Sequence, residues 1–528
     1  MKLEGLSLVG YGRAKPAGQP NAAINPATGA RLEPGYFWAT RQNVEQAAEL
    51  ASRAFFEYGR WPAKRRAGLL RRTADLFETN ASAMIERAQQ ETALPAARLQ
   101  GEMARTCGQL RLFASLIEEG WWLGARIDHG DPQRKPLPKP DVRAMLTPLG
   151  PVAVFSSSNF PFAFSVAGGD TASALAAGCP VIVKPHQGHL GTSELAGQTV
   201  IQAARECDAP EGTFSLLFGP GREVGSALVQ HRLVKAAGFT GSRSGGRALM
   251  DIAAARPEPI PFYAEMGSVN PVFFLSNALA QSPEALAAGL HASVTLGVGQ
   301  FCTNPGLAFV QAGAPAQKFL DKLADLMAAT PPGAMLTPSI CSEYCVGIEK
   351  VSHVPGVRRA AEAPRISGPG EAMGWAVLFT TRAETFLANQ ALADEVFGPS
   401  TLVVECASGA EMVAIAKGLE GQLTATVQGS AEDLASNHEL LAVLQTKVGR
   451  LVYNGFPTGV EVCHAMVHGG PYPATADGRS TSVGTRAIER FARPVCYQNF
   501  TDAALPDELK ESNPLSLWRL VDGKMGKH

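Results

Sequence analysis

Cys302 stands in a short stretch whose composition suits an accessible thiol. Residues 296–306 read LGVGQFCTNPG, so small and polar residues flank the cysteine and a Pro-Gly pair follows it. Gly299 and Gly306 allow the backbone to bend sharply on either side. Such a turn can present the thiol at the mouth of a cavity, where it is open to chemistry. Taken alone, a free cysteine is more often a small buried hydrophobic residue, so the rest of the chain decides the interpretation.

Other residues that could do chemistry interrupt apolar runs. Asn159 lies in the loop after the run PVAVF, Lys184 ends the run PVIVK, and Glu265 stands within FYAEMG. The alternative for Glu265 is a surface carboxylate at the end of a strand. A glycine-rich loop, GSRSGGR, covers residues 241–247 and opens a helix.

The loop at 241–247 could bring backbone N–H groups to a pyrophosphate at a helix terminus. It lacks the spacing G-x-G-x-x-G, and Arg247-Ala248 replaces the lysine and hydroxyl residue of a P-loop. The alternative is an ordinary tight connection between a strand and a helix.

Alternating strands and helices are expected to position these residues. Short apolar runs at 151–155, 180–185, 214–218 and 234–240 are typical of strands buried on both faces, with helical segments between them. This alternation predicts a parallel, doubly wound sheet. Ligands bind at the carboxyl ends of such strands, so Asn159, Lys184 and the loop after Thr240 should share one edge.

The remaining segments complete this outline. Residues 1–40 are expected to form an N-terminal segment that precedes the helical region. Residues 42–125 have helical periodicity with a break at 80–82. The segment 126–149 is rich in Pro and charge, which favours a strand pair that leaves the domain. After Cys302 we expect a strand at 306–310 and a helix at 316–327. Residues 494–500 form a plausible extra strand.

Composition narrows the class of protein. With 528 residues, 45% of them hydrophobic, the chain can form two or three domains. A formal net charge of -1 gives no electrostatic reason to propose nucleic acid or an anionic membrane as a partner. The first residues lack the apolar core of a signal peptide, and no run of about twenty residues is apolar enough to span a bilayer.

The nine cysteines are scattered along the chain and odd in number. This pattern argues against a disulfide framework and favours a reducing cytoplasm. Cys341 and Cys345 could share a helix face, but no histidine lies beside them, so we interpret them as structural and expect no metal site.

Six motifs occur in one order over nearly the whole chain. They are Asn159-Phe160-Pro161, Lys184-Pro185, Phe239-Thr240-Gly241-Ser242 with Gly246, Glu265 with Gly267, Gly299-Gln300-Phe301-Cys302, and Glu395-Val396-Phe397-Gly398-Pro399. In this order they resemble the aldehyde dehydrogenase superfamily. The stretches RPEPIPFYAEMGSVNP, NGFPTGVEV and MVHGGPYPAT resemble its α-ketoglutarate semialdehyde (2,5-dioxopentanoate) dehydrogenase branch. That branch is similar to an NADP-dependent fatty aldehyde dehydrogenase of luminous bacteria.

The resemblance implies roles for three residues. Cys302 would be the nucleophile, whose thiolate forms a thiohemiacetal with the aldehyde and then a thioester. The side-chain amide of Asn159 and the backbone N–H of the cysteine would stabilise the oxyanion. Glu265 would be the general base for hydrolysis of the thioester. A non-catalytic homologue would be expected to lose these residues, and a coenzyme-A-acylating enzyme would not need this base.

The resemblance also implies an NAD or NADP site. Lys184 and Glu395 would hold ribose hydroxyls, Phe397 would flank the nicotinamide riboside, and the pyrophosphate would lie on Gly241, Ser242 and Gly246. Gln187 occupies the position at which many NAD-preferring relatives carry a glutamate. Loss of that carboxylate removes repulsion against a 2′-phosphate, and His186 and His189 could help to bind one. We therefore expect NADP to be accepted. Alternatively, Gln187 hydrogen-bonds a ribose hydroxyl and selects little.

Substrate recognition has two interpretations. Residues 162–167 carry no cation to meet a distal carboxylate, and Arg111, on a helix that lines the tunnel in the family, is the candidate donor. The alternative for Arg111 is an exposed residue or a structural ion pair. An apolar tunnel is expected from Phe160, Phe164, Phe301 and Phe456. The substrate predicted by the resemblance is α-ketoglutarate semialdehyde, and the alternative is a fatty or general aliphatic aldehyde.

The implied fold is α/β, with two doubly wound parallel-sheet domains and a bridging strand element. Residues 1–125 and 148–265 would form the coenzyme-binding domain and residues 266–475 the catalytic domain. Residues 126–147 and 476–528 would form the bridging element, which in the family joins protomers into dimers or tetramers.

Overall fold

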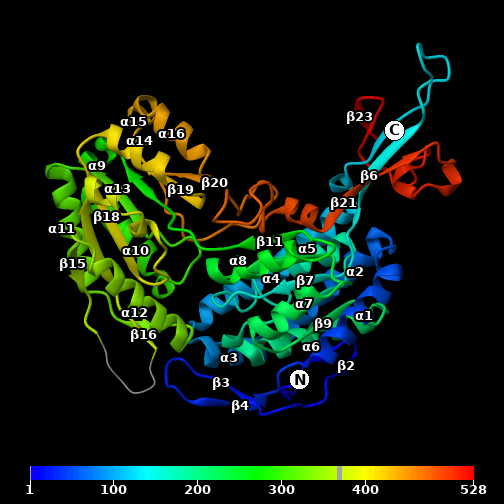
Figure 1. The fold of residues 1–528 in the computed structure, drawn as a ribbon, viewed down its shortest axis with the longest axis horizontal. Coiled ribbons are helices and arrows are strands. Elements are labelled where there is room, and N and C mark those ends of the chain that lie inside the picture. Colours follow the sequence, from blue (N-terminus) through cyan, green and yellow to red (C-terminus); the bar gives the residue numbers. More distant parts are fainter. Residues whose placement is uncertain (1, 366–371, 528) are drawn as a thin grey trace.

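Two lobes and a projecting arm make up the molecule, as Figure 1 shows for this computed structural model. The structure describes residues 2–365 and 372–527. Each lobe is built on a seven-stranded sheet, and the arm is built on a five-stranded sheet. The α/β fold class predicted from the sequence, with two mainly parallel sheets, is confirmed.

The sheet of the first lobe has the order β11-β10-β7-β8-β9-β1-β2. Its first five strands are parallel, whereas β1 runs antiparallel to both β9 and β2. The strands are β1 (Leu8–Val9), β2 (Gly12–Arg13), β7 (Val152–Phe155), β8 (Val181–Lys184), β9 (Phe214–Leu216), β10 (Ala236–Thr240) and β11 (Phe262–Glu265). The strands β7 and β8 are buried at every position, as expected for a sheet covered on both faces.

Eight helices belong to the described part of this lobe. They are α1 (Arg41–Tyr58), α2 (Ala63–Thr79), α3 (Ala81–Thr92), α4 (Ala96–Glu119), α5 (Gly169–Ala177), α6 (Leu190–Glu206), α7 (Ser226–Gln230) and α8 (Arg243–Ala254). The predicted break at 80–82 is observed, because Asn80 separates α2 from α3. The helical segment between β9 and β10 begins as a π-helical turn over Gly221–Gly225 before α7.

The sheet of the second lobe has the order β15-β17-β18-β13-β12-β19-β20 and is parallel except at β15. Its strands are β12 (Val272–Phe274), β13 (Leu307–Gln311), β15 (Arg358–Glu362), β17 (Val377–Arg382), β18 (Ser400–Cys406), β19 (Gln422–Gln428) and β20 (Val448–Tyr453). The helices around it are α9 (Ser276–Gln281), α10 (Pro283–Thr295), α11 (Ala314–Ala328), α12 (Pro338–Ser352), α13 (Ala383–Ala388), α14 (Gly409–Gly418), α15 (Ala431–Ser436) and α16 (His438–Gln445). Phe273 stacks on Phe309 in its core, with ring centroids 4.7 Å apart.

The arm contains the order β21-β6-β5-β22-β23 and projects away from both lobes in Figure 1. Its strands are β5 (Arg126–Asp128), β6 (Val142–Pro148), β21 (Ala492–Gln498), β22 (Arg519–Val521) and β23 (Lys524–Gly526). The strand pair expected within 126–149 therefore leaves the first lobe, and the strand expected near 494–500 pairs with it.

The lead-in at residues 1–40 contributes more structure than its sequence indicates. In addition to β1 and β2, it forms the two-stranded sheet of β3 (Asn21–Ile24) and β4 (Arg31–Tyr36). A further two-stranded sheet pairs β14 (Gly333–Ala334) with β16 (Met373–Gly374). These strands are only two to six residues long, so their periodicity is too brief to distinguish them from loops.

Candidate active site

Cys302 lies in the loop that leads into β13. A strained turn comes before it, because Gly297, Val298 and Gly299 all have left-handed backbone angles, with φ of 57°, 58° and 66°. A side chain on Gly299 would lie 2.2 Å from the carbonyl carbon of Gly398, so only glycine fits there. Val298 adopts a conformation that β-branched residues rarely occupy. The surrounding structure therefore holds this turn in a fixed shape.

Hydrogen bonds from the Asn270 side chain fix the backbone of the cysteine loop. The amide of Asn270 donates hydrogen bonds to the carbonyl oxygens of Cys302 and Asn304, both at 2.9 Å. Asn304 in turn donates to the carbonyl of Gly398 at 3.0 Å. The Asn270 side chain is fully buried, so these bonds are shielded from competing water. The position of the thiol is thus fixed by the second lobe.

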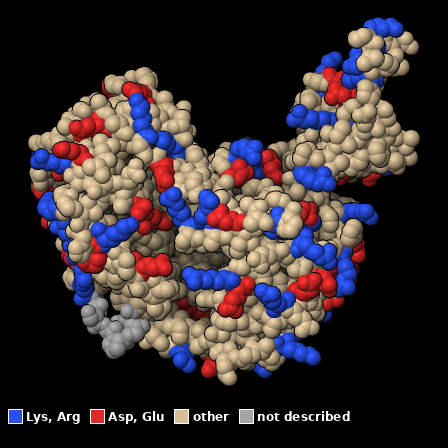
Figure 2. Space-filling view, in the orientation of Figure 1, with Lys and Arg blue, Asp and Glu red and all other residues tan. Residues whose placement is uncertain are grey.

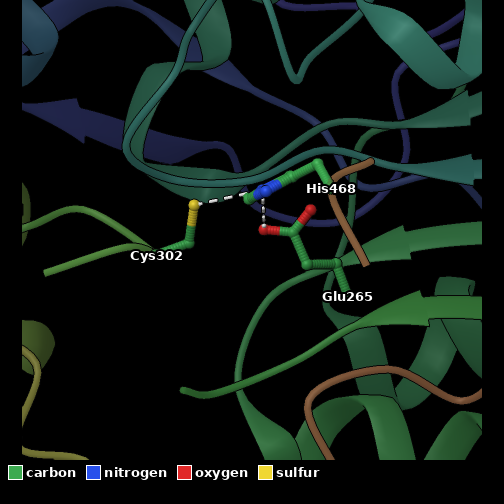
Figure 3. Close-up of side chains that lie close together, drawn as sticks. All are labelled: Glu265, Cys302 and His468. Carbon is green, nitrogen blue, oxygen red and sulfur yellow. Dashed lines mark hydrogen bonds and ion pairs between the residues drawn. The ribbon is translucent and has the colours of Figure 1, made fainter. Parts of the chain in front are cut away.

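His468 lies between the thiol and a carboxylate (Figure 3). Its Nε2 atom is 3.4 Å from Sγ of Cys302 and 2.9 Å from Oε1 of Glu265. Ser482 donates a hydrogen bond of 2.9 Å to the other oxygen of that carboxylate. Glu265, His468 and Ser482 are all buried. One imidazole nitrogen therefore contacts both groups that could exchange a proton.

Two segments bring these side chains together. Glu265 ends β11, and the stretch 474–476 runs beside that strand, with Met266 N–H donating to the Ala474 carbonyl and Ala476 N–H donating to the Ala264 carbonyl. His468 and Ser482 lie on either side of this stretch in the sequence, and the N–H of Ser482 donates to the carbonyl of His468. The chain therefore folds back over Glu265 and encloses its carboxylate.

The electrostatics of the site favour a thiol and a carboxylate at rest. Burial raises the pKa of Cys302 well above its ordinary value, and the negative charges of Glu265 and Glu395 raise it further, against the opposing effect of Arg105. Burial also favours the neutral form of Glu265, but the His468 charge and the hydrogen bonds from His468, Ser482 and Cys302 outweigh it and lower the Glu265 pKa. The site therefore places a thiol beside an ionised carboxylate that could accept its proton.

Asn159 lies at the boundary between the lobes. Its side-chain amide donates to the carbonyl of Gln300 at 3.0 Å, two residues before Cys302. Its own carbonyl accepts a hydrogen bond of 2.6 Å from Arg98 on α4. These contacts place the amide next to the cysteine loop, which is the location that an oxyanion donor requires.

The expected common edge of the first sheet is formed. The strands β10, β7 and β8 are adjacent and parallel, so the ends that carry Thr240, Asn159 and Lys184 lie together. The ammonium of Lys184 is buried and has no hydrogen-bond or ion-pair partner within residues 2–365 and 372–527. Burial lowers its pKa to about 8. A buried cation without a partner fits a polar ligand such as a ribose.

The loop at 241–247 forms the N-terminus of α8. Ser242 is the N-cap and accepts a hydrogen bond from the N–H of Gly245. A side chain on Gly246 would lie 2.7 Å from Met266, and one on Gly241 would lie 2.8 Å from Phe239. The glycines therefore let the helix approach β10 and β11 closely. This geometry leaves backbone N–H groups at a positive helix end, which suits a pyrophosphate.

Glu395 faces the same region from the second lobe. Its Oε2 atom lies 2.5 Å from the place where a side chain of Gly267 would begin, so Gly267 admits the carboxylate. Although water reaches Glu395, protein surrounds the carboxyl group on most sides, and this raises its pKa to about 8. Phe397 follows it and is half-buried. The donors and acceptors at this edge fit a dinucleotide.

The residues near Gln187 bear on a 2′-phosphate. Gln187 is exposed. The ring of His186 accepts from the N–H of Gly188, and the ring of His189 bonds to Ser193 and to the carbonyl of Ser157. Burial lowers the pKa of both histidines. Burial thus disfavours the charged form of both histidines, which weakens any electrostatic attraction of these rings to a 2′-phosphate.

Four phenylalanines were expected to line a substrate tunnel. Phe160 packs against Phe164 and Phe301, with ring centroids 5.3 and 5.6 Å apart. Phe164 reaches the ring of His468 at 6.1 Å. The structure thus brings three of them together beside the thiol. Phe456 belongs to the second lobe, where a side chain on Gly289 of α10 would lie 2.2 Å from its ring.

The prediction that Arg111 meets a substrate carboxylate is wrong. Its guanidinium lies at the surface and pairs with Asp75 and Glu78 of α2 at 2.7 and 2.5 Å. The hydrogen bonds that Arg111 donates to Glu78 and Asp75 raise its pKa, so the cation is paired there and not at the active site. The structural ion pair, the alternative at this position, is what the helix forms.

Sequence reasoning missed two residues at the centre of the site. His468 stands in MVHGGPYPAT, a stretch that carries the family resemblance, but a lone histidine before two glycines gives no sign of its partner. Ser482 lies within residues that were assigned to the bridging element. Both are more than 200 residues from Glu265 along the chain, so only the fold reveals the contact.

Comparisons with known proteins identify the family of this chain. Residues 14–492 match the model of the aldehyde dehydrogenase family. The chain is 51% identical over 525 residues to alpha-ketoglutaric semialdehyde dehydrogenase 2 of Azospirillum brasilense, covering 99% of this chain and 100% of that protein. It is 47% identical to alpha-ketoglutaric semialdehyde dehydrogenase of Acinetobacter baylyi, covering 93% of each. The chain therefore belongs to the aldehyde dehydrogenase family.

Solved structures share the fold. The aldehyde dehydrogenase KauB from Pseudomonas aeruginosa is 23% identical and superposes with a TM-score of 0.80, covering 94% of this chain and 97% of that one. A lactaldehyde dehydrogenase is 20% identical, with a TM-score of 0.81 and coverage of 94% and 99%. Within the described residues, the structure contains no helix with both the length and the apolar character that a membrane crossing needs.

Proposed function

We propose that this chain oxidises α-ketoglutarate semialdehyde to α-ketoglutarate with NADP or NAD as hydride acceptor. The observation that carries the proposal is the 51% identity, over the whole chain, to a protein named for this substrate. The contact of His468 with Cys302 and Glu265 supports the chemistry. A family member without catalysis would not be expected to keep this arrangement.

In the proposed reaction, Cys302 is the nucleophile. Glu265, which is hydrogen-bonded to the thiol, accepts the Sγ proton and passes it to solvent. The thiolate that remains attacks the aldehyde carbon and gives a thiohemiacetal. Asn159 and the backbone N–H of Cys302 donate to the oxyanion. The bound coenzyme supplies a hydride acceptor, and loss of the hydride converts the thiohemiacetal into a thioester.

Hydrolysis of the thioester completes the cycle. Glu265 accepts a proton from the attacking water, and the acid and the free thiol are released. Ser482 and His468 hold the carboxylate in its ionised form, so Glu265 can act as a base near neutral pH. This step distinguishes the reaction from acyl transfer to a thiol cofactor.

The residues expected to hold the coenzyme keep their proposed roles. Lys184 and Glu395 would hold ribose hydroxyls, Gly241, Ser242 and Gly246 would hold the pyrophosphate, and Phe397 would flank the nicotinamide riboside. Gln187 stands where many NAD-preferring relatives carry a glutamate, so no carboxylate at this position would repel the 2′-phosphate of NADP. The first lobe, with residues 1–125 and 148–265, would bind the coenzyme, and residues 266–475 would supply the thiol.

We also propose that the arm joins protomers into a homodimer or homotetramer. Several large apolar side chains on the arm are exposed, namely Leu137, Phe500, Trp518 and Met525, and the arm stands clear of both lobes (Figure 1). The face seen in Figure 2 intersperses basic and acidic residues, which offers no uniform field for a nucleic acid. Nine free cysteines suit the reducing cytoplasm.

The second candidate is oxidation of fatty or general aliphatic aldehydes. The cluster of Phe160, Phe164 and Phe301 beside the thiol favours it, since an apolar wall suits an alkyl chain. Production of NADPH and NADH by purified protein should be compared for α-ketoglutarate semialdehyde, succinate semialdehyde and hexanal. The proposal predicts the highest kcat/KM for the first, whereas a preference for hexanal would overturn it.

A further inference from the structure

The aromatic cluster beside Cys302 is covered by a positively charged helix face. Arg98 and Arg105, two turns apart on α4, direct their guanidinium groups onto the rings of this cluster. Arg98 lies 5.1 Å from the centre of Phe160 and 4.7 Å from that of Phe301. Arg105 lies 5.8 Å from the centre of Phe160 and 5.3 Å from that of Phe164. The cluster thus combines apolar rings with two cationic groups on the side that α4 covers.

Arg105 lies near the groups of the candidate active site. The charge that affects its guanidinium most is that of Glu102 on its own helix, followed by those of Cys302, Glu265 and Glu461. Phe164, over which Arg105 lies, also touches the ring of His468. A ligand whose reacting carbon lies at Sγ would therefore extend past these rings toward Arg105.

The guanidinium of Arg105 lacks the partners that such a group requires. Its Nε and Nη2 atoms are shielded from solvent and donate no hydrogen bond to any residue that the structure describes. Glu102 does not fill this role: its Oε1 atom accepts the N–H groups of Phe162 and Ala163 at 2.7 and 2.9 Å, and its buried Oε2 atom accepts no hydrogen bond from Arg105. Unsatisfied donors on a shielded cation are costly, so the site is suited to an anion that arrives from outside.

The other arginines near the site are already engaged. Arg98 donates to the carbonyl of Asn159. Arg450 donates to the carbonyls of Pro457 and Gly459, at 2.7 and 3.0 Å, and so holds the loop that carries Phe456. Among the arginines of the described chain that face Cys302, Arg105 is the one with two unpaired N–H groups on its guanidinium.

We propose that Arg105 binds the distal carboxylate of the substrate and thereby sets the preference for an acidic semialdehyde. This inference rests on the proposed function. The planar fork of a guanidinium matches a carboxylate through two parallel hydrogen bonds, and Nε with Nη2 forms one such pair of donors. In α-ketoglutarate semialdehyde, four bonds separate the aldehyde carbon from the carboxylate carbon, which gives an extended reach of about 5 Å.

The geometry also explains how an apolar tunnel can serve an acid. The rings of Phe160 and Phe164 exclude water around the guanidinium, and a charge-assisted hydrogen bond is stronger in such surroundings. An uncharged aldehyde of equal length would leave the cation unpaired when it displaces water. Discrimination by an unpaired polar group is larger than discrimination by one extra methylene.

The test compares an acidic and a neutral aldehyde of equal carbon number in matched variants. The variants are Arg105→Gln and Arg105→Lys, with Arg111→Gln as the control because Arg111 pairs only at the surface. The substrates are α-ketoglutarate semialdehyde and pentanal. For Arg105→Gln we expect kcat/KM for the acid to fall about 10- to 100-fold, mainly through KM, because a hydrogen bond to a charged group is lost.

The same variant should lose much less kcat/KM on pentanal than on the acid, so that the preference for the acid falls about 10-fold or more. The Arg111→Gln control should keep kcat/KM for both substrates within about threefold. Arg105→Lys retains the charge without the fork, so its loss should be intermediate. Hydrolysis of p-nitrophenyl acetate, a neutral ester, reports whether Cys302 remains reactive in each variant. If Arg105→Gln does not fold, the same comparison is made with Arg105→Lys, and competitive inhibition of pentanal oxidation by glutarate measures how tightly wild type and this variant bind a carboxylate.

The outcomes separate the two proposals. A wild-type enzyme that prefers pentanal to the acid refutes the proposed function itself. A wild-type enzyme that prefers the acid, with an unchanged preference in Arg105→Gln, refutes only the assignment of Arg105. Equal losses on the acid, on pentanal and on the ester would show that Arg105 serves the fold, and would also overturn the assignment.

Discussion

Removal of the Ser482 hydroxyl should raise the pKa of the catalytic carboxylate. In the structure, Ser482 donates to Oε2 of Glu265 at 2.9 Å, and its Oγ also lies 3.1 Å from the carbonyl of His468. A hydrogen bond to a charged group contributes about 1.5–3 kcal/mol, and one pKa unit corresponds to about 1.4 kcal/mol. Because the hydroxyl proton is shared between two acceptors, we take the lower value, which predicts a rise of about one unit.

The direction of the pKa change follows from the form of Glu265 that the Ser482 hydrogen bond stabilises. Ser482 stabilises ionised Glu265, and its loss in Ser482→Ala favours the protonated acid, so the acidic limb of deacylation should move to higher pH by about one unit. The lowered pKa of Glu265 in the folded wild type also stabilises the fold above the unfolded pKa, and that contribution is lost as pH falls through the folded pKa. Ser482→Ala should therefore lower thermal stability at neutral pH more than in acid.

The assay is the hydrolysis of p-nitrophenyl acetate followed through its burst. The burst reports acylation of Cys302, and the slower phase reports deacylation, whose pH profile is compared between wild type and Ser482→Ala. Ser436→Ala, which removes an exposed hydroxyl on α15, is the control. An acidic limb that stays in place, with the burst intact, would refute the reasoning that Ser482 sets the ionisation of Glu265.

Three further predictions concern the cysteine loop and its surroundings. Cys302→Ser should abolish aldehyde oxidation yet keep coenzyme binding, measured by fluorescence titration; retained turnover would contradict the nucleophilic role. Gly299→Ala should lower the free energy of unfolding by at least about 2 kcal/mol, because the added methyl group would clash with Gly398 and the backbone has a positive φ. Denaturant unfolding measures this change. A loss below about 0.5 kcal/mol, which is roughly the scatter of neutral substitutions, would contradict the prediction. Zinc should inhibit reversibly, because donor atoms of Glu265, Cys302 and His468 lie within 4.8 Å of one another; activity assays with and without a chelator test this, and insensitivity to zinc would contradict it.

Much of the fold was predictable because its strongest signals are local. Buried strands such as β7 and β8 are continuous apolar runs, and the residues that follow them must share one edge of a parallel sheet. The ends that carry Asn159 and Lys184 were placed correctly for this reason. In contrast, β1 joins the sheet beside β9, which lies about 200 residues away in the sequence. Because β1 is only two residues long, its sequence shows no alternation that could identify it as a strand.

The choice of arginine shows where sequence reasoning stops. Arg105 and Arg111 belong to the same helix, and six residues turn it by about 240°, so the two side chains leave on different faces. The sequence singles out Arg111, which stands between two leucines, and does not say which face of the helix meets Cys302. Arg111 forms ion pairs with Asp75 and Glu78 of α2, and these pairs depend on how α2 and α4 pack against each other.

The most direct measurement of the proposed reaction is the mass of the enzyme during turnover. Glu265→Gln removes the base for hydrolysis and also the negative charge that raises the pKa of Cys302. At mildly alkaline pH the thiol can therefore lose its proton to solvent, and the thioester should accumulate when the variant is mixed with NADP and α-ketoglutarate semialdehyde. We predict that the peptide containing Cys302 carries the five-carbon acyl group, and only when coenzyme is present. No adduct, or an adduct on another cysteine, would contradict the assignment of this site and this substrate.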